Sequence, residues 1–428
     1  MAQTKGYYTR MKITDYGPYI TKIILPFEQE IVQGDNDYRE KFCVYVERLD
    51  EKGEILELPK SWLALDDREP SKGYIPVIDA YPSDKNGEKC ERGEFLTLEM
   101  AYGPLYPLSA AISAPNGYNV YVNSVYRITQ IADITSENGN INGLVYDYSL
   151  GNQMPDAAGF FNAVSSYKEP LNYGYFVPQA KGKRPLIIWL HGAGEGGVDA
   201  TIAYTGNKVV RLASPKVQAL FGGAYILAPQ TKTYWMDDGA GTIGESGETI
   251  YTEALKACID EFVENHEGID MSRIYIGGDS NGGFMTMKMI IAYPDFFAAA
   301  FPICEALRDD TVTDEDINSI KDIPIWFTHA KNDPLVIPDK YVVPTYERLI
   351  KAGASDVHFT FWDKICDIHE GFVDEQGSPY EYIGHFAWIP MLNDDCRTDY
   401  DGTPVVYEGR EVTLLQWLAL HSRALHSR

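Results

Sequence analysis

The chain has 428 residues, of which 45% are hydrophobic and 23% are charged, and its formal net charge at pH 7 is −25. This length exceeds that of a usual single core, so two domains are expected, and the apolar content excludes a disordered chain. The acidic balance, without a cluster of Lys and Arg, argues against nucleic-acid partners because phosphate binding needs concentrated positive charge.

Membrane and metal sites are also not expected. No segment is long and apolar enough to span a bilayer, and the start MAQTKGYYTR lacks the apolar core of a signal peptide. We therefore expect a soluble protein with no membrane partner, either cytoplasmic or exported with its leader removed. The cysteines lack the spacing of a zinc site, so we expect no metal or cofactor. We expect the thiols to be free and mostly buried; they are Cys43, Cys90, Cys258, Cys304, Cys366 and Cys396.

Residues 1–134 predict an all-β domain. Short segments with alternating apolar residues, such as 42–49, 93–100 and 118–128, are separated by clusters of Gly, Pro, Asn and Asp. This pattern predicts an immunoglobulin-like sandwich, which we consider a candidate surface for polysaccharide, a partner subunit or homo-oligomer formation. The Asn-, Ser- and Gly-rich run 133–144 predicts a linker or exposed loop, so the second domain is placed at 135–428.

In the second domain, predicted strands alternate with predicted helices. This alternation is typical of a mostly parallel sheet with helices on both faces, and here it predicts an α/β-hydrolase fold. Near-continuous apolar runs indicate strands that are buried on both sides. The predicted strands are 171–178, 185–192, 224–230, 273–280, 324–333 and 357–363, and the clearest helical periodicities lie at 252–266 and 411–423.

A candidate nucleophile lies in the segment GGDSNGG at 277–283. Ser280 stands between an apolar strand and the apolar helix FMTMKMIIAY, in the pattern GxSxG. A nucleophile elbow holds its serine in a sharp, strained turn, where Gly278 and Gly282 must lack side chains because the backbones pass closely. GxSxG alone also occurs in plain turns, but the strand before it and the helix after it favour the elbow.

A candidate oxyanion hole follows the strand 185–190, in the segment HGAGEGG. In α/β-hydrolases the hole combines the backbone N–H after the nucleophile, here that of Asn281, with one from such a loop. Ala193 or Gly194 would supply the second N–H. The alternative is a Gly-rich turn in which His191 only hydrogen-bonds the backbone.

The acid of a triad should follow the nucleophile along the chain, at the end of a later strand. Asp333 fits, since it follows the strand 324–330 and precedes Pro334. A solvated turn residue is the alternative for Asp333. Asp363 and Asp367 are weaker rivals because they follow the next strand.

The base should be a histidine still further along the chain. His369 lies nearest the last predicted strand, whereas His385 opens the apolar segment FAWIPML, which could anchor its loop over the sheet. The pattern favours His385 and leaves His369 open. His191, His329 and His358 do not fit the order Ser, Asp, His.

Two further residues are candidates for a substrate pocket. Trp235 follows the strand 224–230 at the carboxyl edge of the sheet, where ligands bind in open α/β folds, although a core position is an equal alternative. Asp279 lies directly beside the nucleophile. Glu195 could contact substrate or cap the helix that follows it, and we favour the cap.

The chain resembles two-domain bacterial esterases, which are prolyl-oligopeptidase-like α/β-hydrolases with an N-terminal immunoglobulin-like domain. The segments that carry the resemblance are HGAGEGG, GGDSNGGFMTMKMIIAYPDFFAAAFPICEA, HAKNDPLV and GHFAWIP. It implies the triad Ser280, Asp333 and His385 and so favours His385 over His369. It also implies hydrolysis of short acyl or aryl esters, and some relatives release feruloyl or acetyl groups from plant polysaccharides.

The function expected from these features is carboxylic ester hydrolysis through an acyl-enzyme on Ser280. A serine peptidase is the first alternative, because prolyl oligopeptidases share this catalytic domain. Their usual partner is a β-propeller, and residues 1–134 show no blade repeats. A protein that binds polysaccharide or a partner through its N-terminal domain is the alternative of another class.

Overall fold

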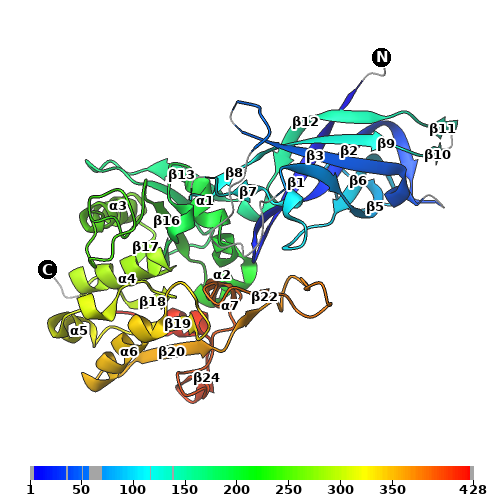
Figure 1. Cartoon of the computed structure of the whole chain (residues 1–428). Coiled ribbons are helices and arrows are strands. Elements are labelled where there is room, and N and C mark those ends of the chain that lie inside the picture. The colour runs from blue at the N-terminus through cyan, green and yellow to red at the C-terminus, as the bar shows by residue number, and fades with distance from the viewer. Residues whose placement is uncertain are drawn as a thin grey trace. The chain divides into compact units, whose positions relative to one another are not determined.

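The structure is a computed structural model, which describes residues 4–34, 37–50, 52–56, 70–115, 117–136 and 139–424. The chain divides into two compact units, Met1–Ala158 and Gly159–Arg428 (Figure 1). The repeat LHSRALHSR at the C-terminus lies partly outside the described residues.

The first unit is built on one ladder of eight strands in the order β4-β3-β9-β12-β1-β2-β6-β5. Neighbouring strands are antiparallel except β1 and β12, which pair in parallel. The strands are β1 (Lys5–Thr14), β2 (Gly17–Val32), β3 (Phe42–Leu49), β4 (Lys72–Ile75), β5 (Val77–Ser83), β6 (Arg92–Met100), β9 (Asn123–Gln130) and β12 (Val145–Gln153). Short elements complete the unit: β7 (Ile112–Ser113), β8 (Val120–Tyr121), β10 (Ile134–Ser136), β11 (Gly139–Ile141), η1 (Tyr38–Lys41), η2 (Pro107–Ser109) and η3 (Pro155–Ala157).

Alternating side chains build the core of this unit. In β3, Val44 and Val46 are buried while their neighbours are only partly covered, which is the period of two that places one face of a strand inward. In β6, Leu98 and Met100 are buried on either side of the half-buried Glu99, but Thr97 is buried as well as Leu96 and Leu98. The predicted all-β unit is therefore confirmed, and its packing follows the alternation read from the sequence.

The division between the units lies later in the chain than the predicted boundary after residue 134. The strand β12, which follows that boundary, pairs with β1 and β9 and so belongs to the first sheet. The linker or exposed loop predicted at 133–144 contains two short paired strands, β10 and β11, with Ile134 opposite Ile141. Asn and Gly mark hairpin turns as readily as linkers, which explains the difference.

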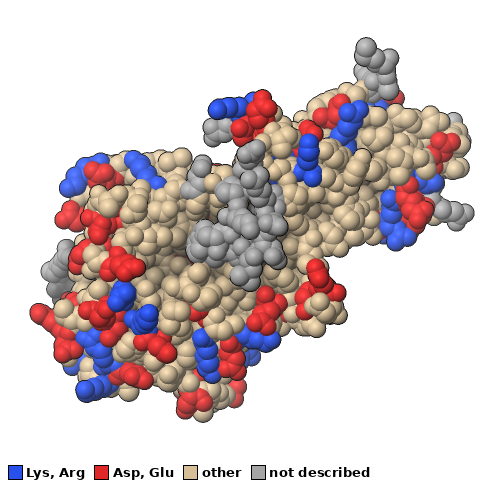
Figure 2. Space-filling model, in the orientation of Figure 1, with Lys and Arg blue, Asp and Glu red and all other residues tan. Residues whose placement is uncertain are grey.

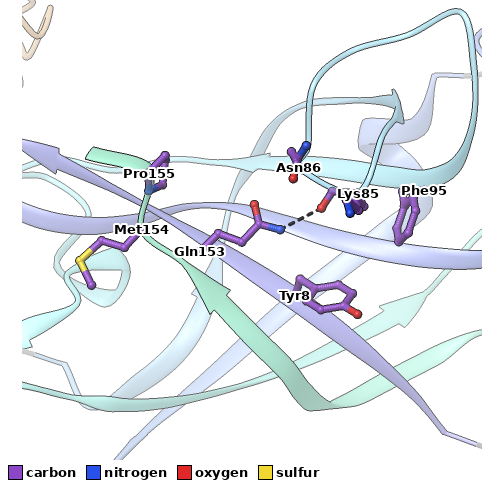
Figure 3. A pocket seen from close by; sticks show the side chains of 7 residues that line it. All are labelled: Tyr8, Lys85, Asn86, Phe95, Gln153, Met154 and Pro155. Carbon is purple, nitrogen blue, oxygen red and sulfur yellow. Dashed lines mark hydrogen bonds between the residues drawn. The ribbon is translucent and has the colours of Figure 1, made fainter. Parts of the chain in front are cut away.

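A cavity of about 460 Å³ opens in the first unit (Figure 3). The Gln153 side-chain amide donates to the Lys85 carbonyl across it, at 2.8 Å. None of the candidate catalytic residues lines this cavity. Its lining consists of Tyr8, Lys85, Asn86, Phe95, Gln153, Met154 and Pro155.

The second unit contains an eight-stranded sheet in the order β13-β14-β16-β15-β17-β18-β19-β20. The strands from β16 to β20 run parallel, and β13 and β14 join antiparallel at one edge. Their bounds are β13 (Phe160–Val164), β14 (Asn172–Phe176), β15 (Arg184–Leu190), β16 (Tyr225–Gln230), β17 (Ile269–Asp279), β18 (Ala299–Ile303), β19 (Ile325–Ala330) and β20 (Val357–Trp362). This is the predicted α/β-hydrolase fold, with β13 and β18 added to the strands read from the sequence.

Helices cover this sheet in two groups: α3 to α6 pack successively on one another, and α2 packs on α8. The helices are α1 (Ala200–Thr205), α2 (Pro215–Phe221), α3 (Thr252–Asn265), α4 (Asn281–Ala292), α5 (Asp314–Ile320), α6 (Val342–Lys351), α7 (Trp388–Leu392) and α8 (Leu414–Leu420). The remaining elements are η4 (Ala193–Glu195), η5 (Val209–Ala213), η6 (Asp309–Thr311), η7 (Pro338–Lys340), β21 (Ile365–Cys366), β22 (Glu381–Tyr382), β23 (Val406–Tyr407) and β24 (Arg410–Glu411).

The parallel strands are buried on both faces, as their continuous apolar runs predict. In β19, Ile325 and Phe327 join the apolar cluster that includes residues of α3 to α6. Trp326, between them, points the other way and packs edge-on against Trp417 of α8, with ring centroids 5.5 Å apart. The sheet is thus fixed between two helical layers, and its carboxyl edge is held in place for a site.

Charges of both signs are mixed on the surface (Figure 2), and the thiols are free as expected, although only half of them are buried. On the face shown in Figure 2, Lys and Arg side chains are interspersed with Asp and Glu. All six cysteines are free, and Cys258, Cys304 and Cys396 are buried. Within the described ranges, no helix combines the length and the apolar character that a bilayer span requires.

Trp417 is expected to hold α8 on the sheet. Its ring is fully buried, and its indole N–H donates to Asp356 at 3.0 Å. Trp417→Ala should lower the free energy of unfolding by about 3–5 kcal/mol, because it leaves a large cavity beside Trp326. Chemical denaturation of the full chain would measure this. Leu420→Ala, at a half-exposed position of the same helix, should change it by no more than about 0.5 kcal/mol; equal losses in both variants would contradict the packing argument.

Candidate active site

Ser280 occupies a strained turn between β17 and α4. Its backbone angles are φ 54° and ψ −113°, in a region that non-glycine residues rarely adopt. The Ser280 N–H donates to the Ile303 carbonyl at 2.8 Å, and the Ser280 carbonyl accepts from the Phe284 N–H at 2.9 Å. These bonds fix the turn to both β18 and α4, which is the strand-turn-helix geometry that the GxSxG pattern predicts.

Two glycines allow the turn to pass close to β15. A Cβ atom added at Gly278 or at Gly282 would overlap the Leu190 carbonyl at the end of that strand. A Cβ atom at Gly283 would lie 2.7 Å from the Ile303 carbonyl oxygen. The glycines around Ser280 are therefore required by close approach to the neighbouring strand ends, as the sequence suggested for the first two.

His191 anchors the loop that follows β15. Its Nδ1 lies 2.6 Å from the Gly192 carbonyl, and its Nε2 accepts the Thr231 N–H at 3.1 Å. Burial lowers the His191 pKa to about 4, so the ring is neutral at pH 7 and carries its proton on Nδ1. The backbone-bonding role foreseen as an alternative for His191 is thus observed, and it holds the loop that contains Ala193 and Gly194.

The backbone N–H groups proposed for an oxyanion hole come from adjacent strand ends. Asn281 is the first residue of α4, where helix N–H groups have no partner within the helix. Ala193 and Gly194 lie in η4, directly after β15, whose Leu190 stands opposite Gly278 in the sheet. The Asn281 side chain is held elsewhere, because its Oδ1 accepts the backbone N–H of Trp235 at 2.6 Å.

Asp333 follows β19 and accepts hydrogen bonds from four groups. One carboxylate oxygen lies 2.7 Å from His385 Nδ1 and 2.9 Å from His329 Nε2. The other accepts the Leu335 and Val336 N–H groups at 2.8 and 3.1 Å. Burial alone would raise the Asp333 pKa, but the two histidines outweigh it and the pKa lies below its usual range. The carboxylate is therefore ionised at neutral pH.

His385 reaches Asp333 from a loop that packs on the acid's own turn. A Cβ atom at Gly384 would lie 2.7 Å from the Asn332 carbonyl carbon, so the two loops touch at backbone distance. The following helix α7 is buried throughout, which anchors the loop as the apolar segment predicted. With Nδ1 donating to Asp333, the proton-accepting nitrogen of a neutral His385 is Nε2.

The rival residues have other partners. His369 Nε2 lies 2.7 Å from Asp395. Asp363 pairs with Lys331 at 2.6 Å on the surface, and Asp367 accepts the Tyr382 hydroxyl at 2.8 Å. The structure thus brings His385, and not His369, to Asp333.

The two pocket candidates are buried beneath the site. Trp235 has no exposed surface, and its ring packs near His191 and Tyr251, which is the core position foreseen as its alternative. Asp279 is 1% exposed, and its carboxylate faces Gly192 and Asn207. Glu195 is the last residue of η4 and is also buried, so it is not exposed to a substrate. It does not cap α1 either, because Asp199 caps that helix.

Two residues at this edge were missed by the sequence analysis. The order Ser, Asp, His excludes His329 as the base, but His329, the penultimate residue of β19, donates to Asp333. The spacing of four residues between His329 and Asp333 is the signal that could have suggested the pair. Glu305 follows β18 beside Gly283, and burial raises its pKa to about 8. The only sequence signal for Glu305 was its position as a carboxylate at the end of an apolar run.

Comparison with protein families supports both units. Residues 7–143 match the family described as esterase Ig-like N-terminal domain, and residues 173–366 match phospholipase/carboxylesterase. The second match contains Ser280 and Asp333 and ends before His385. The crystal structure of a thermostable esterase has a TM-score of 0.72 and 23% identity, and the alignment covers 98% of this chain and all of that one. That likeness confirms the two-domain fold.

Curated relatives match parts of the chain. A poly(3-hydroxyalkanoate) depolymerase C from Paucimonas lemoignei is 27% identical over 46% of this chain and 38% of its own length. A probable acetylxylan esterase A from Aspergillus terreus is 27% identical over 33% of this chain and 46% of its own length. The chain thus spans less than half the length of these relatives.

Gly282→Ala should disrupt the turn at Ser280. The new methyl group would overlap the Leu190 carbonyl, and the overlap can be relieved only if β15 or α4 moves. The free energy of unfolding should therefore fall by more than about 3 kcal/mol. Thermal unfolding of the full chain would measure it. Gly371→Ala is the control: its φ of 79° is unfavourable for alanine, but the space is open, and about 1–2 kcal/mol is expected. A Gly282 variant no less stable than the control would refute the close approach.

His329→Leu should destabilise the protein in a pH-dependent way. The change removes a donor from the buried Asp333 carboxylate and should lower the free energy of unfolding by about 2 kcal/mol at pH 7. Burial lowers the His329 pKa, so below about pH 6.5 the unfolded wild type takes up a proton that the folded one does not. The wild type therefore loses stability on acidification, and the deficit of the variant should shrink between about pH 7 and 5. A deficit that grows over this range would contradict the assignment.

Proposed function

Because the chain joins an esterase immunoglobulin-like N-terminal domain to a domain of the phospholipase/carboxylesterase family, we propose that it is a serine carboxylesterase. The observation that carries the proposal is the 2.7 Å pairing of His385 with Asp333 at the sheet edge that also presents Ser280. Ser280 follows β17 and Asp333 follows β19, and both strands flank β18 in parallel. Carboxyl ends of neighbouring parallel strands meet at one edge, where such triads are assembled.

In the proposed mechanism, His385 Nε2 takes the Ser280 hydroxyl proton as the oxygen attacks the ester carbonyl carbon. The resulting oxyanion accepts hydrogen bonds from the N–H of Asn281 and from that of Ala193 or Gly194. His385 then returns the proton to the leaving alkoxide, which departs as the alcohol and leaves the acyl group on Ser280. Water, deprotonated by His385, then attacks the acyl carbon, and the acid leaves as His385 returns the proton to the Ser280 oxygen.

Asp333 sets the orientation and tautomer of His385. Its ionised carboxylate accepts the Nδ1 proton and stabilises the imidazolium that forms in each step. The hydrogen bonds from Leu335, Val336 and His329 keep this carboxylate in place and ionised. A carboxylate held by four donors cannot turn away from His385 without leaving buried N–H groups unpaired.

We propose short acyl or aryl esters as substrates, including acetyl or feruloyl esters of plant polysaccharides. The relatives that support this class are named for hydrolysis of acetylated xylan and of poly(3-hydroxyalkanoate), both of which are carboxylic esters. A serine peptidase is less well supported, since the N-terminal unit is an eight-stranded ladder rather than a set of propeller blades.

Ser280→Ala should reduce hydrolysis of p-nitrophenyl acetate by about 10⁴-fold or more and should abolish labelling by a fluorophosphonate, because both require the serine oxygen. His385→Ala should lose activity similarly, whereas the control His369→Ala should keep it within about threefold. Circular dichroism would verify that each variant is folded. A panel of acetyl, butyryl, octanoyl and feruloyl esters beside peptide anilides would define the class, and an active, unlabelled Ser280→Ala variant would refute the proposal.

A further inference from the structure

Two buried carboxyl groups and one amide lie between the nucleophile turn and the loop after β15. Asp279 is the last residue of β17 and directly precedes Ser280. Glu195 ends η4, and Asn207 follows α1. Asp279 and Glu195 are only 1% and 5% exposed. Buried carboxyl groups are rare and demand specific partners, so this cluster calls for an explanation.

The three side chains converge on one point of the loop. Asn207 Nδ2 lies 3.1 Å from Asp279 Oδ2 and 3.3 Å from Glu195 Oε2. A Cβ atom added at Gly192 would lie 2.6 Å from the same Asp279 oxygen and 3.0 Å from the same Glu195 oxygen. Both carboxyl oxygens therefore lie against Gly192, where a side chain would not fit, and both accept from the Asn207 amide.

This arrangement connects the two halves of the proposed oxyanion hole. Asp279 is covalently followed by Ser280 and Asn281, and Gly192 is followed by Ala193 and Gly194. A displacement of Gly192 from Asp279 would therefore change the distance between the N–H of Asn281 and the N–H groups of η4. Oxyanion stabilisation depends on donors being fixed before the charge develops.

Two ionised carboxylates at this point would repel each other in a poorly solvated environment. Burial, and then the charge of Glu195, raise the pKa of Asp279 well above its usual range. With one proton on the pair, a single negative charge remains beside the Asn207 amide, and the repulsion between the two groups is removed. Two carboxyl groups that interact this closely titrate as a pair.

We propose that the Asp279–Glu195 pair, sharing one proton, is a positioning device that locks Gly192 and the η4 backbone against the nucleophile turn and so sets the oxyanion hole. The inference rests on the proposed esterase function and extends it. Neither carboxyl group touches the substrate in this scheme, because both are buried beneath the loop. Their effect is exerted through Gly192, Ala193 and Gly194.

The consequence is an alkaline limit to activity. Loss of the shared proton leaves two like charges, which push the loop from the turn and misalign the donors, so turnover should fall as pH rises through the titration of the pair. Other titratable groups around the pair are Cys304, after β18, and His191, after β15. Lys208 adjoins Asn207 and is ion-paired with Glu370 at 2.6 Å. Burial, followed by the charges of Asp333 and Asp279, raises the Cys304 pKa, and His191 is neutral, so neither adds a charge at pH 7.

The test compares Asp279→Asn with Asp279→Ala in the full chain. Asparagine keeps the size of Asp279 against Gly192 and an oxygen for the Asn207 amide, and it carries no proton that alkali can remove. It should retain most of the activity at low pH and should lose the alkaline decline. Alanine removes the support, and kcat should fall by about 10- to 100-fold with little change in KM, because the ground state does not use the oxyanion donors. Asp363→Asn, at an exposed salt bridge, should keep the wild-type pH profile.

The measurements are kcat and KM for p-nitrophenyl acetate between about pH 6 and 9, with fluorophosphonate labelling of Ser280 at each pH. An alkaline decline in Asp279→Asn equal to that of the wild type would overturn the positioning proposal while leaving the esterase proposal intact. A wild type that neither hydrolyses esters nor reacts with the label would instead refute the esterase proposal. Circular dichroism of Asp279→Ala separates loss of folding from loss of kcat, and the asparagine variant tests the inference even if the alanine variant does not fold.

Discussion

The second unit depends on the close approach of the Ser280 turn to the end of β15. Its backbone passes the Leu190 carbonyl at a distance that only Gly278 and Gly282 permit, and Ser280 itself adopts a left-handed φ. Strain of this kind costs about 1–3 kcal/mol and persists only where the surroundings over-determine it. Here the surroundings are the buried parallel strands on either side and the apolar helix α4, whose packing holds the turn in the conformation that exposes a serine oxygen at the sheet edge.

The electrostatics of this edge follow from burial. Asp333 is kept ionised by two histidines and two backbone N–H groups, whereas Asp279 beside Ser280 has its pKa raised by burial and by Glu195. The same residue type thus has its pKa shifted in opposite directions at two positions of this sheet edge. In the proposed mechanism the charged acid orients His385, and the protonated pair fixes backbone donors, so each environment matches its role.

The sequence predicted much of this unit because its signals are local. A strand, a glycine-flanked serine and a helix are contiguous in the chain, and the parallel strands reveal themselves as apolar runs. The sequence did not predict the strands β13 and β18, because β13 is half exposed and β18 is embedded in a longer apolar stretch. The predicted boundary of the first unit lies too early because β12 pairs with β1, which is far from it in the sequence. No local pattern in β12 indicates that pairing.

What the sequence determined by itself was the position of Ser280, the strand-end position of Asp333 and the fold that brings such positions to one edge. The tertiary structure alone decided which histidine meets Asp333, since His385 lies 52 residues further along the chain, and that His329 contacts the same carboxylate. It alone joined Asp279 to Asn207, 72 residues apart. Contacts of this kind depend on how loops pack on a completed sheet, and no local pattern of residues encodes that packing.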